Sequence, residues 1–168
     1  KLGCFTVLGN HDYIDYDRII VKLEELGIKV VDNDYFLLND NITIIGVQDV
    51  WRGHPKLPNY PSDKVNILLS HNPDFINKIS DNDNIDFMLS GHYHGGKIKL
   101  FKMTLQRAIT KYVYGYFEKG KTKLYVTSGV GGSYGRGKRG KYIRFNARPE
   151  INKFKLKGER LWLRVLTQ

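Results

Sequence analysis

The order of apolar and polar residues predicts strands and helices that alternate along the chain. The apolar run "CFTVLG" (4–9) ends at a Gly-Asn pair, which is typical of a strand followed by a turn. Residues 15–27 repeat apolar side chains at helical spacing and end in glycine, which predicts a helix. The β-rich runs at 28–32, 35–38 and 42–47 predict strands, and Asn-Asp-Asn between the last two predicts a hairpin turn.

The rest of the chain continues this alternation. "VNILLS" (65–70) and "DFMLS" (86–90) are nearly continuous apolar runs, as in strands covered on both faces, and a helix is expected between them at 73–80. The final third is typical of antiparallel ribbon joined by Gly-Lys turns, with strand-like runs in 112–130, 141–146, 154–157 and 161–166. These elements together predict a layered α/β domain with mixed sheets at its centre.

The composition is that of one domain covering 1–168. The 168 residues are 41% hydrophobic and 12% aromatic, which is enough apolar material for a core. Lys and Arg outnumber Asp and Glu by 27 to 17, and the formal charge of +10 favours anionic partners such as phosphates, nucleic acids or acidic headgroups. Cys4 is the single cysteine, which excludes an internal disulfide and a cysteine metal cluster.

The ends of the chain leave localisation open. No apolar run is long enough to span a bilayer, and no charged-then-apolar leader opens the sequence. The chain starts without Met and almost inside a strand, so we expect an upstream piece to be missing. The intact protein is therefore expected in the cytoplasm or at a membrane.

Polar side chains gather where three predicted strands end. Asn10 and His11 follow the first strand in "GNHD", His71 follows another in "SHNPD", and His92 and His94 follow a third in "GHYHGG". Open α/β sheets place their ligands at the carboxyl ends of strands. Residues two apart in an extended chain point the same way, so His92 and His94 can face one site from a single segment.

Imidazole nitrogens and an amide oxygen together form a mixed donor set that suits Mn, Fe or Zn. A single histidine is more often a surface or core residue than a ligand, but three clusters at strand ends favour a functional site. A structural zinc site built from His11, His71, His92 and His94 is the alternative. Structural zinc sites are usually rich in cysteine and locally spaced, whereas these residues are spread over most of the chain.

"GNHD", "SHNPD" and "GHYHGG", in that order, resemble the later motifs of the calcineurin-like metallophosphoesterases. The tail from 112 to 151 is similar to the bacterial branch that contains membrane-associated phosphoesterases and relatives of UDP-diacylglucosamine pyrophosphohydrolase. The resemblance covers most of residues 3–151. It implies a four-layered α/β/β/α sandwich of mixed β-sheets, and a hydrolase that binds two divalent metal ions, Mn, Fe or Zn.

The resemblance also implies roles for individual residues. Asn10, His71 and His92 correspond to ligands of one metal, and His94 to a ligand of the other. His11 corresponds to the general acid and Asp12 to the carboxylate that orients its ring. In the family, a hydroxide bridging the two metals attacks phosphorus, and the acid protonates the leaving oxygen.

The chain departs from the family pattern at several places. The family's D-x-H motif and its G-D motif, whose Asp bridges both metals, are absent and would lie upstream of residue 1, so this chain alone is expected to be poorly active. Tyr93 stands where Thr is usual and Lys97 where Gln is usual, which affects expectations about specificity. "GVQDV" (46–50) stands where relatives often carry paired acids, so a role for that pair does not transfer.

Two other motifs in the glycine-rich segment fit less well. "GGSYG" matches a nucleophile elbow with Ser133 as nucleophile, but no helix signal follows, as that motif requires. "GSYGRGKR" approaches a phosphate-binding loop, but Arg139 stands where Ser or Thr must hold magnesium. A glycine-rich active-site loop or a hairpin describes this segment better.

Two classes of function remain at this stage. The first is a dinuclear metal-dependent hydrolase of a phosphoester or pyrophosphate, acting on a phosphorylated small molecule, a phospholipid or a nucleotide-linked lipid. In that case the basic run at 136–144 would bind substrate phosphates or an anionic membrane surface. The alternative is that this run is a solvated loop. The second class, less favoured, is a nucleic-acid-binding module or nuclease that uses the basic surface and interleaved tyrosines.

Overall fold

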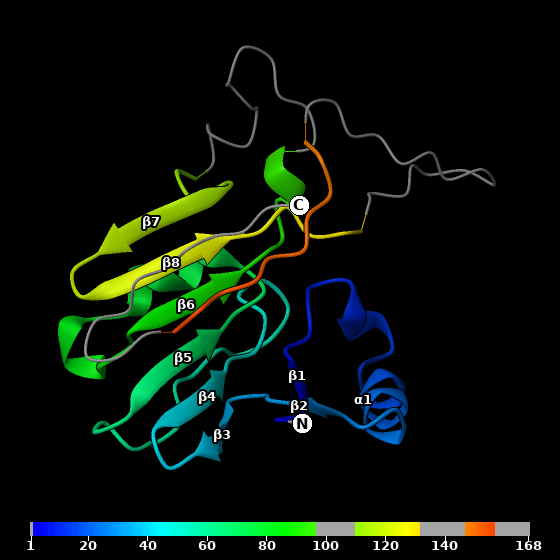
Figure 1. Cartoon of the computed structure of the whole chain (residues 1–168). Coiled ribbons are helices and arrows are strands. Elements are labelled where there is room, and N and C mark those ends of the chain that lie inside the picture. The colour runs from blue at the N-terminus through cyan, green and yellow to red at the C-terminus, as the bar shows by residue number, and fades with distance from the viewer. Residues whose placement is uncertain (1, 97–109, 132–146, 157–168) are drawn as a thin grey trace.

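The computed structural model describes residues 2–96, 110–131 and 147–156, and it has the expected α/β character with mixed sheets (Figure 1). Its strands are β1 (Cys4–Thr6), β2 (Ile28–Val30), β3 (Asp34–Asn39), β4 (Ile42–Gly46), β5 (Val65–Leu69), β6 (Phe87–Ser90), β7 (Gly115–Lys119) and β8 (Thr122–Val126). Its helices are α1 (Tyr16–Glu25) and the 3₁₀ turns η1 (Asp12–Ile14), η2 (Pro73–Lys78), η3 (Asp81–Asp83) and η4 (His94–Gly96).

The larger sheet has the strand order β3-β4-β5-β6-β8-β7. Strands β4, β5, β6 and β8 run parallel, and β3 and β7 pair with them antiparallel through the predicted hairpins. The smaller sheet pairs β1 with β2 in parallel, and Figure 1 shows it beside α1, to one side of the larger sheet. The parallel strands therefore direct their carboxyl ends to one edge of the larger sheet.

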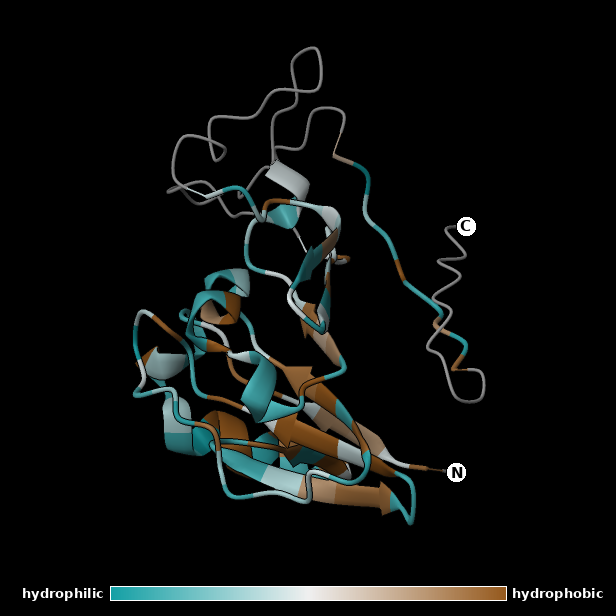
Figure 2. Cartoon of the chain, turned by 90° about the vertical axis from the view of Figure 1, so that its left-hand side faces the viewer, coloured by the Kyte–Doolittle hydropathy of each residue, from teal (hydrophilic) through white to brown (hydrophobic). Residues whose placement is uncertain are grey.

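The larger sheet is covered on both faces, as the apolar runs of β5 and β6 predict. Leu68, Met88 and Leu124 belong to one buried cluster with residues of η2, whereas Ile67 and Phe87 belong to another on the opposite face. Figure 2 shows apolar residues concentrated in these strands. Neighbouring residues of a strand point to opposite faces, so a strand buried on both faces needs a continuous apolar run.

The segment expected to form a helix at 73–80 is instead the short 3₁₀ helix η2. Asn72 caps its start by accepting a hydrogen bond from the Asp74 backbone N–H at 2.9 Å. At its end the Lys119 ammonium group donates to the carbonyl oxygens of Ile76, Asn77 and Ile79 at 2.7–3.2 Å. These carbonyls are therefore satisfied without another helical turn.

Several expectations fall on other parts of the chain. Lys97, Ser133, Arg139, the basic run at 136–144 and the strand-like runs at 141–146 and 161–166 lie outside the described residues. Of the run at 154–157, residues 154–156 are described and have irregular backbone rather than strand. In the described ranges, no helix is long and apolar enough to cross a membrane.

Candidate metal centre

Three of the predicted site residues bring their donor atoms together at the ends of strands. Asn10 follows β1, His71 follows β5 and His92 follows β6. The Asn10 Oδ1 atom lies 3.2 Å from His71 Nε2, and His71 Nε2 lies 3.1 Å from His92 Nδ1. The site thus joins the smaller sheet to the larger one.

The separations of these atoms fit a shared metal ion. Two donors that bind one Zn²⁺ ion at about 2.0–2.1 Å are about 2.8–3.4 Å apart when the bond angle lies between a right angle and the tetrahedral angle. The two separations in the structure fall within this range. An amide oxygen and two imidazole nitrogens are also a donor set that borderline divalent metals accept.

The GNHD loop is shaped so that its backbone touches the His71 ring. A Cβ atom added to Gly9 would lie 2.7 Å from the Cε1 atom of His71, which is too close for any side chain. The Asp12 carboxylate accepts a hydrogen bond from the Gly9 N–H at 2.8 Å and so closes the turn that presents Asn10. Glycine at position 9 is therefore required by a close approach of the backbone.

His11 and His94 lie near this centre, but their side chains are not among the three that converge. His11 is exposed at the start of η1, and its charge contributes to lowering the pKa of His71. His94 is half-buried at the start of η4, and its charge contributes to lowering the pKa of His92. Their roles as acid and as ligand of a second metal stay predictions.

Burial favours the neutral form of both central histidines. Burial is the main cause of the lowered pKa of His71, and the charges of Asp49 and Asp12 oppose it. Burial and then the neighbouring His71 lower the pKa of His92 to about 4. Neutral imidazoles keep a lone pair for a metal at neutral pH, because metal binding requires the deprotonated ligand.

A fourth loop, after β4, brings Asp49 and Trp51 near this centre. The Asp49 side chain is fully buried and accepts hydrogen bonds from the backbone N–H groups of Trp51 and Arg52. Its Oδ2 atom has no hydrogen-bond partner among the described residues. The Trp51 ring meets the His92 ring edge-on, with centroids 4.3 Å apart. Asp49 lies directly beyond a strand end, which is the signal that would have found it.

The described residues do not by themselves complete a two-metal site. In the ranges that the structure describes, no group of three or more His, Cys, Asp or Glu side chains is placed to hold a metal ion. The converging set contains two such residues together with the Asn10 amide. It therefore has too few donors for the complete coordination sphere of even one ion.

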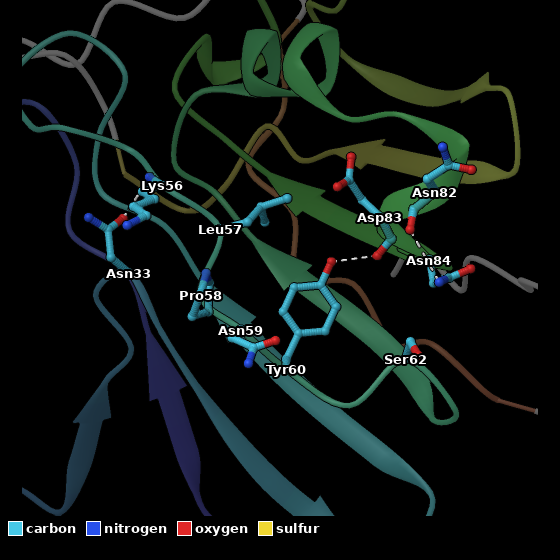
Figure 3. Close-up of a pocket in the computed structure, with 10 residues that line it drawn as sticks. All are labelled: Asn33, Lys56, Leu57, Pro58, Asn59, Tyr60, Ser62, Asn82, Asp83 and Asn84. Atoms are coloured by element: carbon cyan, nitrogen blue, oxygen red, sulfur yellow. Dashed lines mark hydrogen bonds between the residues drawn. The ribbon is translucent and has the colours of Figure 1, made fainter.

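One cleft lies apart from these three residues. It has a volume of about 570 Å³ and is lined mainly by amide and hydroxyl side chains around Tyr60, as Figure 3 shows. The Tyr60 hydroxyl donates to the Asp83 carbonyl oxygen at 2.5 Å across the cleft. None of the three converging residues lines it, so the chemistry of the strand-end loops defines the candidate site better than the cleft does.

The fold and this centre define an α/β protein with nitrogen and oxygen donor atoms gathered at its strand ends. Comparisons with known proteins identify its family. The chain is 34% identical over 140 residues to an uncharacterized metallophosphoesterase of Helicobacter pylori (strain J99), covering 77% of the chain and 37% of that relative. It is 32% identical over 165 residues to phosphodiesterase YaeI of Escherichia coli (strain K12), covering 90% of the chain and 57% of the relative.

A third relative carries a more specific name. UDP-2,3-diacylglucosamine pyrophosphatase LpxG of Chlamydia muridarum is 27% identical over 214 residues, covering 89% of the chain and 63% of the relative. The chain belongs to the metallophosphoesterase family. It spans about two fifths to three fifths of the length of these relatives. No family profile matches the chain, and no solved structure matches it.

Proposed function

We propose that the protein is a metal-dependent hydrolase of phosphoric ester or anhydride bonds, with Asn10, His71 and His92 holding one of two divalent ions. The observation that carries the proposal is that Asn10 Oδ1 and His92 Nδ1, from loops far apart in the chain, lie 3.2 and 3.1 Å from His71 Nε2. The names of the relatives support the reaction class. His94 is the ligand that this chain contributes to the second ion.

Each residue has a defined task in this proposal. Bound divalent ions would lower the pKa of a water molecule and neutralise negative charge on the phosphoryl oxygens. His71 and His92 present neutral imidazoles, and Asn10 presents its amide oxygen. Asp12 fixes the turn of the GNHD loop through Gly9. Exposed His11 on the same loop donates a proton to the leaving oxygen.

For the substrate, we propose a phosphodiester or a pyrophosphate linkage, in a lipid or nucleotide-linked lipid. YaeI is named a phosphodiesterase, and LpxG is named a pyrophosphatase of UDP-2,3-diacylglucosamine. The formal charge of +10 favours a substrate or membrane surface with negative charge. The alternating tyrosines do not form one exposed platform for bases, because Tyr112 is buried at 2% exposure whereas Tyr114 and Tyr116 are 37% and 45% exposed.

Hydrolysis of bis(p-nitrophenyl) phosphate by the longest natural form of the protein tests the reaction class. We expect activity with Mn²⁺ that a chelator abolishes. His92→Ala should lower the rate by about 100-fold or more, because loss of an outer partner of a ligand alone costs about 10–100-fold. His54→Ala is the matched control, since His54 lies outside the three motifs. Activity that survives both the chelator and His92→Ala contradicts the proposal.

The role of His11 is tested by comparing leaving groups. His11→Ala should slow hydrolysis of an alkyl phosphodiester by roughly 10²–10⁴-fold, because an alkoxide needs a proton to leave. The same variant should change the rate with the p-nitrophenolate leaving group much less. An equal rate of His11→Ala and wild type on the alkyl substrate would show that His11 is not the acid.

A further inference from the structure

One carboxylate connects the loops that carry the candidate histidines. Asp74 lies three residues after His71, at the start of η2. Its Oδ2 atom accepts a hydrogen bond from the Tyr93 hydroxyl at 2.7 Å, and its Oδ1 atom accepts one from the Thr110 hydroxyl. Tyr93 is 5% exposed and stands between His92 and His94. The bond between Tyr93 and Asp74 therefore links the His71 loop to the His92 loop.

The ring of Tyr93 also helps to hold the ring of His92. The two rings meet edge-on with centroids 4.6 Å apart. Trp51 and His71 approach the same imidazole in T-shaped arrangements, with centroids 4.3 and 5.0 Å away. Such contacts from three rings restrict the rotation of the imidazole, and hence the direction of its Nδ1 atom.

The backbone on both sides of Tyr93 is strained. In the described part of the chain, four non-glycine residues have positive φ, namely Asn33, Asn84, His92 and His94. Positive φ is uncommon outside glycine, and His92 (φ 71°) and His94 (φ 49°) adopt it on the two sides of Tyr93. Strained residues persist where the surrounding structure fixes them, and Tyr93 is the buried residue that lies between these two.

We propose that Tyr93 and Asp74 are positioning residues that hold His92 Nδ1 in register with His71 Nε2 for metal binding. The hydroxyl bond sets the spacing between the two loops, and the tyrosine ring sets the orientation of His92. Neither residue contacts the reacting atoms in this account. The inference rests on the proposed metal-dependent function and adds to it the means by which the first metal's ligands are aligned.

The test compares two tyrosine-to-phenylalanine variants in the longest natural form of the protein. Tyr93→Phe removes the hydroxyl and keeps the ring, whereas Tyr60→Phe removes a hydroxyl that bonds the Asp83 carbonyl oxygen at the remote cleft. Zn²⁺ affinity is measured by calorimetry, and Co²⁺ geometry by visible absorption. We expect Tyr93→Phe to weaken Zn²⁺ binding about 10-fold or more and to alter the Co²⁺ spectrum. Tyr60→Phe should stay within about twofold of wild type.

A second variant covers the case in which Tyr93→Phe does not fold. Asp74→Asn keeps the size of the side chain but leaves only one acceptor for two hydroxyl groups. Like Tyr93→Phe, it should weaken Zn²⁺ binding. Near-ultraviolet circular dichroism checks that the variant remains folded.

The outcomes separate this inference from the proposed function. The positioning role alone is overturned if metal binding depends on His92 but Tyr93→Phe changes neither the Zn²⁺ affinity nor the Co²⁺ spectrum. If Tyr93→Phe is unfolded, the same result with Asp74→Asn overturns it. A wild-type chain that binds neither Zn²⁺ nor Co²⁺ overturns both. An equal loss of affinity in Tyr60→Phe also overturns the positioning role, because the effect would then be general.

Discussion

Gly9 packs its backbone directly against the ring of His71, so one added methyl group should disturb the metal centre. In Gly9→Ala the new Cβ atom would meet the ring at 2.7 Å, and the ring must leave its present position beside Asn10 and His92. We expect Zn²⁺ affinity, measured by calorimetry, to fall about 10-fold or more.

Gly131→Ala is the control for this change, because a Cβ atom there meets no described atom within 4 Å and its φ is not positive. Gly131→Ala should bind Zn²⁺ as wild type does. If Gly9→Ala binds Zn²⁺ as tightly as Gly131→Ala, the close packing at His71 has no part in metal binding.

The lowered pKa of His92 makes the metal-free chain sensitive to acid. Burial first, and then His71, lower this pKa from 6.5 to about 4 in the folded state. Between these values the unfolded chain binds a proton at His92 and the folded chain does not, so stability falls as the pH is lowered from about 6.5 to about 4. Urea unfolding of the chelator-treated chain should show this loss, and His92→Gln should show a shallower one. If the free energy of unfolding depends on pH identically in the wild type and in His92→Gln, the lowered pKa of His92 is not the cause of the acid sensitivity.

At the scale of elements, Lys119 of β7 holds the end of η2. Its ammonium group donates to three carbonyl oxygens, at 2.9, 3.2 and 2.7 Å. Lys119→Met should lower the free energy of unfolding by about 1.5–3 kcal/mol, because hydrogen bonds to a charged group are lost and carbonyls lose partners. Chemical denaturation measures this change.

Exposed Lys121, on the turn after β7, gives the control variant Lys121→Met. Its free energy of unfolding should stay within about 0.5 kcal/mol of the wild-type value. Equal effects of the two substitutions would refute the capping role.

The strands were predictable from sequence because their signals are local. The apolar runs of β5 and β6 predict burial on both faces, and Asn39, Asp40 and Asn41 predict the turn between β3 and β4. The 3₁₀ form of η2 was not predictable, because it depends on Lys119, more than 40 residues further along the chain. Local patterns carry no information about such distant partners.

At the scale of the whole molecule, two sheets meet at the candidate metal centre. Asn10 comes from the end of a strand in the smaller sheet, whereas His71 and His92 come from the larger one. The rule that ligands gather at strand ends was enough to group these residues from sequence. It could not show that Tyr93 reaches Asp74, because that contact depends on how the two loops pack.

The central claim is that Asn10, His71 and His92 bind one ion together. A crystal structure of the zinc-loaded protein, with an anomalous difference map at the zinc edge, tests it most directly. The account predicts a peak about 2.0–2.2 Å from Asn10 Oδ1, His71 Nε2 and His92 Nδ1. A peak at other residues with these three atoms left unligated, or the three atoms separated from one another, would contradict it.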